Sequence, residues 1–442
     1  MSAEAPSLPV LQQSRRSSLF ADFSWMFVGN AVYAAGQFAT LILLAKLVRT
    51  EMVGQYALGL ALVYPVMMFT NLQLKAVITS DISKRVEFGH YLGLRLLTTP
   101  FAFVAVYVIT KLLRYDRDLT AVVLMVGVAY GIETISDVYY ARLQLNDRMA
   151  EISKSLMAKA LLSIIGLALA LYISRNVLWG IAGIALARAA VLFAYDISPR
   201  TQGLPVESGQ PAKAKELTPR LNASVQRKLV WLSFPLGLVV LLGCLNSSIP
   251  NFFIKNALGE REVGIFAAIG FVISVGNMAV VSLGQSAFTR LAKAYASGDI
   301  AAFGWLLGKL LAFGATLAGC GMVISEFEGR EILTILFRPE YAERADLLPW
   351  VMAAGGVLFM AQFLGFGLTA ANFYNSQVVL NAAASLSLFI ACFWLVPRQG
   401  LLGAILAMLS AAVVQLAGSI LVLARGVRMR TRACAGESET AS

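Results

Sequence analysis

The sequence is poor in the residues that build metal centres and disulfide frameworks. It holds one histidine, His90, and four cysteines, none of them in a Cys-x-x-Cys pair. A histidine-based metal site is therefore excluded, and the cysteine spacing fits neither a zinc site nor a disulfide-rich domain. Cys244, Cys320 and Cys392 lie inside apolar stretches and are interpreted as small core residues. We expect no metal and no cofactor.

Charged residues are scarce as well. They make up 14% of the 442 residues, against about 25% in a typical soluble chain. Hydrophobic residues make up 58%, and the mean hydropathy is +0.72. Apolar stretches of about 20 residues, long enough to cross a bilayer, recur along the whole chain. The composition excludes a soluble domain and predicts an all-α polytopic membrane protein.

Motifs for nucleotide chemistry are also missing. Residues 304–309 faintly resemble a phosphate-binding loop, but the spacing is too short and no Ser or Thr follows Lys309. We therefore expect no ATP-driven step. The net charge of +11 does not indicate nucleic-acid binding, because the basic residues gather in alternate loops, which is the pattern of membrane orientation.

The apolar stretches predict about twelve membrane spans. Because their number is even, both termini fall on one side, and the basic loops identify that side as cytoplasmic. The spans cover residues 23–47, 54–75, 91–113, 119–142, 155–174, 177–195, 229–253, 263–289, 301–325, 347–371, 376–396 and 400–424.

The second half of the chain echoes the first. Residues 53–57 (VGQYA) return as 263–267 (VGIFA), and two weaker glycine-containing pairs, 88–93 with 303–308 and 180–182 with 403–405, follow in the same order. Such echoes are typical of transporters built from repeats. We predict two copies of one six-helix unit. The expected divisions are a cytoplasmic segment 1–22, a bundle 23–195, a cytoplasmic linker 196–228, a bundle 229–425 and a disordered tail 426–442.

Basic residues inside apolar spans are the main candidates for a binding site. A lone Lys or Arg at a helix centre costs about 2.5–3.5 kcal/mol on insertion scales, so it usually has a partner or a function. One hypothesis is a basic cavity for an anionic head group, and the other is snorkelling to the cytoplasmic interface. Arg95 and Arg188 favour the cavity, and Lys75, Arg142 and Arg290 favour snorkelling. The candidates inside spans are Arg95, Lys159, Arg188 and Lys309, and those at helix ends are Lys75, Arg142 and Arg290.

Uncharged and acidic residues complete the candidate set. Asn30 and Gln37 share a polar face of the first span with Tyr33, and we expect that face to point to neighbouring helices or a cavity. Glu133 and Asp137 lie one turn apart on the fourth span. They either bind a coupling proton or sodium ion, or neutralise Arg95 or Arg142 as buried pairs.

Several stretches of the sequence resemble a known family. The pattern includes Trp25, residues 29–30, 44–47, 53–59 and 72–74 with Pro65, and a second set at 143–155. It is similar to bacterial polysaccharide-export proteins, the Wzx-type flippases of the multidrug/oligosaccharidyl-lipid/polysaccharide exporter (MOP) superfamily. The motifs lie mainly within residues 20–160, and the twelve-span layout extends over the whole chain.

The resemblance implies a fold and a substrate. The fold is that of the multidrug and toxic-compound extruders (MATE), with two bundles around a cavity that opens to alternate faces. The substrate is an undecaprenyl-diphosphate-linked oligosaccharide for cell-surface polysaccharide such as O-antigen or exopolysaccharide, and polymerase and chain-length proteins are expected partners. Two alternatives remain open: an ion-coupled multidrug antiporter on the same fold, and a membrane polysaccharide polymerase or ligase.

Overall fold

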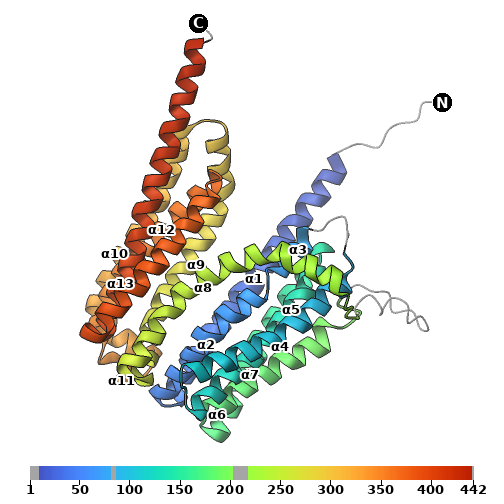
Figure 1. Cartoon of the computed structure of the whole chain (residues 1–442), viewed down its shortest axis with the longest axis vertical. Coiled ribbons are helices and arrows are strands. Elements are labelled where there is room, and N and C mark those ends of the chain that lie inside the picture. The colour runs from blue at the N-terminus through green and yellow to red at the C-terminus, as the bar shows by residue number, and fades with distance from the viewer. Residues whose placement is uncertain (1–8, 81–85, 203–217, 441–442) are drawn as a thin grey trace, which may run out of the picture. The chain divides into compact units, whose positions relative to one another are not determined.

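The computed structural model of the chain describes residues 9–80, 86–202 and 218–440. Every regular element in these ranges is helical, which confirms the predicted all-α class (Figure 1). The α-helices are α1 Pro9–Leu47, α2 Thr50–Thr70, α3 Leu74–Ser80, α4 Phe88–Leu112, α5 Arg117–Leu145, α6 Met149–Ser174, α7 Val177–Val191, α8 Ala223–Leu258, α9 Glu260–Ala296, α10 Ile300–Leu336, α11 Pro339–Ala342, α12 Leu348–Ala370 and α13 Tyr374–Thr440. A π-helical turn, Leu192–Asp196, follows α7.

Ten helical segments in the described ranges are long and apolar enough to cross a membrane. The last of them, Asn375–Gly426, contains two of the predicted spans, 376–396 and 400–424. They are two helices joined by a sharp bend at Gly400, where the backbone is not helical (φ 62°). The predicted span 229–253 lies within α8, which is not among the ten. Large apolar side chains such as Phe101 and Ile173 are exposed, as expected for a surface that meets lipid.

Helix bounds differ from the prediction at both ends of the chain. From Pro9 onward the N-terminal segment is part of α1. The tail from residue 426, expected to be disordered, continues α13 as far as Thr440. Part of the predicted linker, residues 203–217, lies outside the described residues.

The chain divides into two compact units. One contains Met1–Val48 and Leu62–Val240, and the other contains Arg49–Ala61 and Leu241–Ser442. The first three turns of α2 therefore belong to the second unit and the rest of α2 to the first, and α8 is divided in the same way.

Glycines set the closest helix approaches in the first unit. A Cβ on Gly29 of α1 would lie 2.7 Å from the Cα of Ser153 in α6, and a Cβ on Gly183 of α7 would lie 2.3 Å from the carbonyl oxygen of Gly166 in α6. Small residues let helix backbones approach in this way, which is a main source of packing energy between membrane helices. α6 is thus held between α1 and α7.

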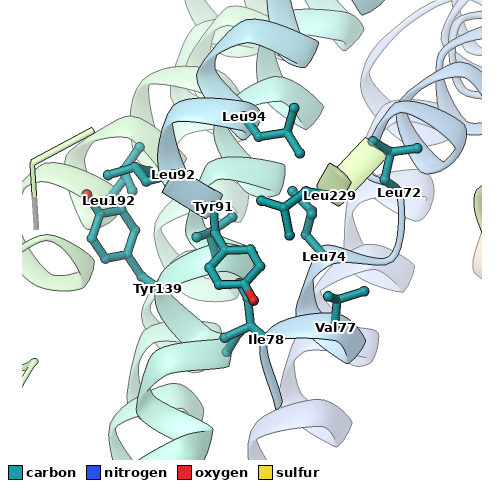
Figure 2. Close-up of a cluster of buried hydrophobic side chains, with 12 residues drawn as sticks. Leu72, Leu74, Val77, Ile78, Tyr91, Leu92, Leu94, Tyr139, Leu192 and Leu229 are labelled. Carbon is teal, nitrogen blue, oxygen red and sulfur yellow. The ribbon is translucent and has the colours of Figure 1, made fainter. Parts of the chain in front are cut away.

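A cluster of buried apolar side chains joins several helices of the first unit (Figure 2). It includes Leu74 and Ile78 of α3, Tyr91 of α4, Tyr139 of α5 and Leu229 of α8. This packing ties the short helix α3 to α4 and α5, directly after the break that ends α2.

Gly183→Ala is expected to destabilise the protein by about 1–3 kcal/mol, because the new methyl group meets backbone, which cannot turn aside. Thermal unfolding of the purified protein in detergent measures the effect. Gly308→Ala is the matched control, since a Cβ there has no neighbour within 4 Å. Equal midpoints for the two variants would show that the α6–α7 approach is looser than described.

Candidate functional site

Arg95, on α4, is the largest fully buried side chain among the described residues and is 1% exposed. Its Nε donates to the carbonyl oxygen of Thr134 at 2.9 Å, and its Nη1 donates to that of Thr70 at 3.3 Å. Its Nη2 donates to Oδ1 of Asn71. α2 ends at Thr70, and the last carbonyls of a helix have no partner within it. Arg95 therefore caps the end of α2 and joins α2 and α4 to α5.

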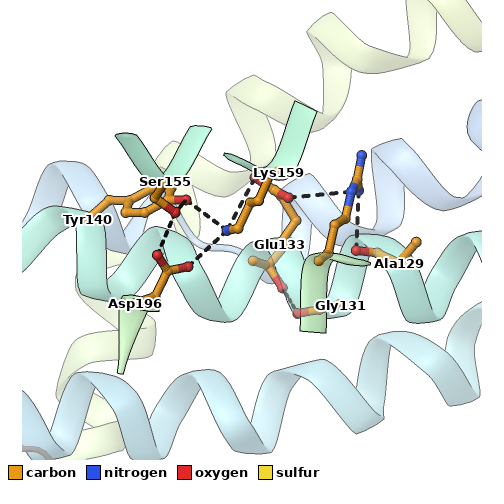
Figure 3. Close-up of polar contacts among 9 residues, drawn as sticks. Ala129, Gly131, Glu133, Tyr140, Ser155, Lys159 and Asp196 are labelled. Carbon is orange, nitrogen blue, oxygen red and sulfur yellow. Dashed lines mark hydrogen bonds and ion pairs between the residues drawn. The ribbon is translucent and has the colours of Figure 1, made fainter. Parts of the chain in front are cut away.

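Four other charged side chains meet in the interior of the same unit and are called here the charge cluster: Glu133 of α5, Lys159 of α6, Arg188 of α7 and Asp196 of the π-helical turn (Figure 3). Lys159 Nζ lies 3.0 Å from Asp196 Oδ2 and 3.9 Å from Glu133 Oε1. Arg188 Nε lies 3.6 Å from Glu133 Oε2. Two cations and two carboxylates thus balance each other where isolated charges would be costly.

The buried end of the cluster is a ring of three hydrogen bonds that one ion pair closes. Lys159 Nζ donates to the Tyr140 hydroxyl at 2.7 Å, which lies 2.7 Å from Ser155 Oγ. Ser155 Oγ donates to Asp196 Oδ1 at 2.5 Å, and Asp196 returns to Lys159 through the ion pair. Because Ser155 and the ammonium both donate, Tyr140 donates to Ser155. Neither Lys159 nor Asp196 has any solvent-exposed side-chain surface, so this ring is a fixed structural joint.

Helical spacing explains most of this convergence. Glu133, Asp137 and Tyr140 are four and three residues apart on α5, and Ser155 and Lys159 are four apart on α6, so each set shares a helix face. Asp196 needs the π-helical turn, whose extra residue per turn changes which side chain faces inward. The Asp196 carbonyl accepts a bond from Gln202 Nε2 at 2.8 Å, which fastens this turn.

The other end of the cluster is less enclosed. The Glu133 side chain is 14% exposed and that of Arg188 5%, against none for Lys159 and Asp196. Arg188 Nη1 donates to the Ala129 carbonyl at 3.3 Å, and its guanidinium lies 5.4 Å from the centre of the Tyr130 ring. Tyr33 of α1 lies within electrostatic reach of both Glu133 and Arg188. This end can therefore exchange partners at lower cost than the ring.

Asp137 is a half-buried carboxylate near both Arg95 and the charge cluster. Its electrostatic neighbours include Lys75, Arg95 and Lys159, together with Glu133. The predicted pairing of Glu133 with Arg95 or Arg142 is not the one found: Glu133 contacts Lys159 and Arg188.

The remaining predicted residues are not members of the charge cluster. Arg142 covers the Phe88 ring at 5.3 Å, and Lys309 lies over Trp305 at 3.5 Å on an exposed face of α10. Arg290 is exposed, Lys75 is half-buried and Gln37 is half-buried. Asn30 is exposed and donates to the Met26 carbonyl of its own helix at 2.8 Å, while the neighbouring Gly29 packs on α6.

Asp196 and Ser155 are missing from the residues predicted for the site. The predicted sixth span ends at residue 195, so Asp196 falls in the expected linker. A signal was present nonetheless, because a lysine in the middle of an apolar helix needs a carboxylate close by. No group of three His, Cys, Asp or Glu side chains in the described ranges is suited to hold a metal ion.

Comparison with known proteins finds a relative by sequence and several solved structures with a similar fold. No family model matches the chain. A capsular polysaccharide biosynthesis protein, CapF of Staphylococcus aureus, is 26% identical over 391 residues, which cover 87% of this chain and 94% of that protein.

Solved structures of membrane transporters match almost the whole chain. An inward-facing multidrug resistance MATE family transporter of the MOP superfamily aligns with a TM-score of 0.69 and 12% identity over 92% of this chain and 98% of that one. The lipid II flippase MurJ, in an inward closed conformation, aligns with a TM-score of 0.69 and 12% identity over 93% and 89%. The chain is a multi-pass membrane protein with the fold of these transporters, as predicted, and its sequence is similar to that of a polysaccharide biosynthesis protein, in line with the predicted resemblance to polysaccharide-export proteins.

Proposed function

We propose that the protein is a flippase that carries a lipid-linked oligosaccharide across the bacterial inner membrane by alternating access. The substrate is an undecaprenyl-diphosphate glycan destined for cell-surface polysaccharide. The fold of known transporters and the relationship to a capsular polysaccharide biosynthesis protein support a carrier in such a pathway. Polymerase and chain-length proteins are the proposed partners, acting on the glycan after it has crossed.

The observation that supports an anionic substrate is the environment of Arg188. The Arg188 side chain is 5% exposed, and its carboxylate partner, Glu133, lies 3.6 Å away and is the most exposed member of the charge cluster. Arginine binds phosphate through two parallel hydrogen bonds, and such bonds are strong where water is scarce. We propose that a substrate phosphate replaces Glu133 on Arg188, and that Lys159 then retains Glu133.

The same cluster favours a proton over sodium as the coupling ion. Sodium needs several oxygen ligands with little positive charge nearby. The cluster carboxylates already face Lys159 and Arg188, and Asp137 lies near Lys75, Arg95 and Lys159. A proton on Glu133 would instead weaken its hold on Arg188 and favour the substrate.

Reconstitution into vesicles tests the proposal. Fluorescently labelled undecaprenyl-diphosphate oligosaccharide is expected to cross the membrane at least about tenfold faster than in protein-free vesicles, as expected for a carrier whose motion gates transport. An imposed pH gradient should change the rate, and a sodium gradient at constant pH should not.

Two controls separate the alternatives. Efflux of a cationic dye without transport of the glycan lipid would favour the multidrug antiporter. A longer glycan product in the presence of a second lipid-linked unit would favour a polymerase or ligase.

The same lipid with a neutral head group tests whether the diphosphate is recognised, and equal transport of both lipids would contradict the role of Arg188.

A further inference from the structure

The start of α4 carries a glycine groove that another part of the chain fills. Gly89 and Gly93 lie one turn apart, and the segment around Arg220 crosses them. A Cβ on Gly89 would lie 2.5 Å from the carbonyl oxygen of Thr218, and a Cβ on Gly93 would lie 2.3 Å from that of Arg220. The Arg220 N–H donates to the Gly89 carbonyl at 2.8 Å, and its guanidinium pairs with Glu87. Within the first unit, these two glycines therefore bind a polypeptide segment.

The equivalent glycines of the second repeat are not covered by the chain. Residues 303–308 (FGWLLG), at the start of α10, repeat residues 88–93 (FGHYLG) of α4. Gly304 and Gly308 are exposed, and a Cβ on either would have no neighbour within 4 Å among the described residues. Alanine stands at the position equivalent to Glu87, so the carboxylate that pairs with the crossing segment in the first unit has no counterpart here.

Small residues continue the groove along α10. The exposed residues that share this face by their spacing of three and four are Gly304, Gly308, Ala312, Ala315 and Gly319. They extend over about 22 Å at about 1.5 Å per residue, which exceeds the roughly 15 Å depth of one leaflet's hydrocarbon. One acyl chain can therefore lie along the helix in this groove. Small residues alone would equally suit another helix, so the neighbouring side chains must identify the ligand.

A lysine and a tryptophan border the groove. Trp305 and Lys309 are one turn apart, and Lys309 Nζ lies 3.5 Å from the centre of the Trp305 ring. Both side chains are exposed, whereas the first repeat has half-buried His90 and buried Leu94 at the equivalent positions. Side chains lean toward the start of their helix, which the predicted topology places at the cytoplasmic surface. A positive charge and an indole ring at that depth suit the headgroup region of a membrane.

We infer that the groove of α10 binds an anionic phospholipid. The headgroup phosphate contacts Lys309 beside the Trp305 ring, and one acyl chain lies along the small residues between Gly308 and Gly319. Charge disfavours other occupants. A second copy packed symmetrically on this face would bring two Lys309 side chains together, and the segment after Gly426 is itself rich in arginine. The site requires a membrane but does not depend on the proposed transport function.

Quenching of tryptophan fluorescence by brominated lipids tests the site. Trp305 is kept and the other tryptophans are replaced by phenylalanine. The protein is reconstituted into phosphatidylcholine vesicles that contain either brominated phosphatidylglycerol or brominated phosphatidylcholine. The anionic lipid is expected to bind beside Trp305 at least about fivefold more tightly, which corresponds to about 1 kcal/mol for one lysine near the membrane surface. Equal quenching by the two lipids would overturn the inference.

A charge variant shows whether the lysine causes the preference. Lys309→Met should abolish the preference for phosphatidylglycerol, while quenching by phosphatidylcholine persists. Lys111→Met is the matched control, because Lys111 is exposed on α4 and lies 5.3 Å from the Tyr107 ring one turn earlier. It lowers the net charge equally and should leave the quenching of Trp305 unchanged. A preference that survives Lys309→Met, or that Lys111→Met also abolishes, would overturn the inference.

A second variant fills the groove without changing the charge. Gly308→Leu is expected to lower the affinity for phosphatidylglycerol at least about fivefold, and an unchanged affinity would overturn the inference. The open surroundings of Gly308 should allow the variant to fold. Native mass spectrometry of phosphatidylglycerol retained in mild detergent gives a second measurement, in which Lys309→Met and Gly308→Leu are compared with a chain that keeps all its tryptophans. Loss of bound lipid in both variants is expected, and equal retention would contradict the site.

Occupation of the groove by a second copy has a different signature. In a variant without the native cysteines, Ala312→Cys places a thiol on the exposed small-residue face. Oxidation in vesicles at low protein density is expected to leave the monomer. A disulfide-linked dimer would overturn the inference and assign this face of α10 to an interface between copies.

Discussion

Lys159→Met is expected to destabilise the protein by about 3–5 kcal/mol, because it removes one partner of a fully buried ion pair. Asp196 would remain in the interior with its Ser155 bond but without the ammonium 3.0 Å away. The Tyr140 hydroxyl would also lose its donor. Thermal or denaturant unfolding in detergent, followed by tryptophan fluorescence, measures the loss.

A double-mutant cycle shows whether the pair is the cause. Lys159→Met combined with Asp196→Asn removes both charges and keeps the shape and an acceptor for Ser155. The double variant should be more stable than the sum of the single changes predicts, by at least about 1.5 kcal/mol. Lys154→Met is the matched control on the same helix. Its side chain is 50% exposed and pairs with Glu151 at the surface, so its loss should matter little. Equal effects of Lys154→Met and Lys159→Met would contradict the buried ring.

The sequence predicts the fold class because bilayer physics leaves few choices. Apolar stretches of sufficient length must be helices, and their number and the echoes between them favour two similar halves. The positions of the lysine and arginine residues within those stretches also identify Lys159 and Arg188 as buried charges, as the structure shows.

The partners of a buried charged side chain are harder to predict from the sequence than its burial. Arg95 was expected in a cavity, yet its donors meet the carbonyls of Thr134 and Thr70 and the Asn71 side chain. The acceptors at Thr70 and Asn71 are available because α2 ends at that point, which no local pattern reveals. Asp196 depends on one π-helical turn. A one-residue change in helix register decides whether it enters the site or the loop.

The repeated segments show the same limit of prediction from sequence, which is that contacts between distant residues are not revealed. The sequence shows that residues 53–57 and 263–267 are alike, and the structure places them inside α2 and α9, respectively. The sequence does not show that the copies touch, because that contact depends on how the repeats fold together. Only the structure places Gly54 against Glu260 and Gly264 against Thr50.

Arg95 and Arg188 are expected to separate stability from transport. Arg95→Ala should destabilise the protein by at least about 3 kcal/mol, since three charged hydrogen bonds disappear and the end of α2 loses its cap. Arg188→Ala should cost less, because Glu133 keeps Lys159 as a partner. Its transport of the diphosphate lipid should fall at least about 30-fold, which corresponds to the loss of about 2 kcal/mol from a buried charged contact.

Conservative variants distinguish the two roles. Arg188→Lys retains the positive charge but not the planar fork, so it should transport between the rates of Arg188→Ala and the unmodified protein. Arg188→Met should match Arg188→Ala, because it fills space without charge.

The lysine of Arg95→Lys cannot reach all three acceptors, which lie on two different helices. This variant should therefore remain destabilised, while the protein that still folds transports normally. If Arg95→Ala instead keeps its unfolding midpoint and loses transport, Arg95 belongs to the substrate path and not to the joint between α2, α4 and α5. If Arg188→Ala transports at the normal rate, the phosphate must bind elsewhere, and the charge cluster serves only to hold α5, α6 and α7 together.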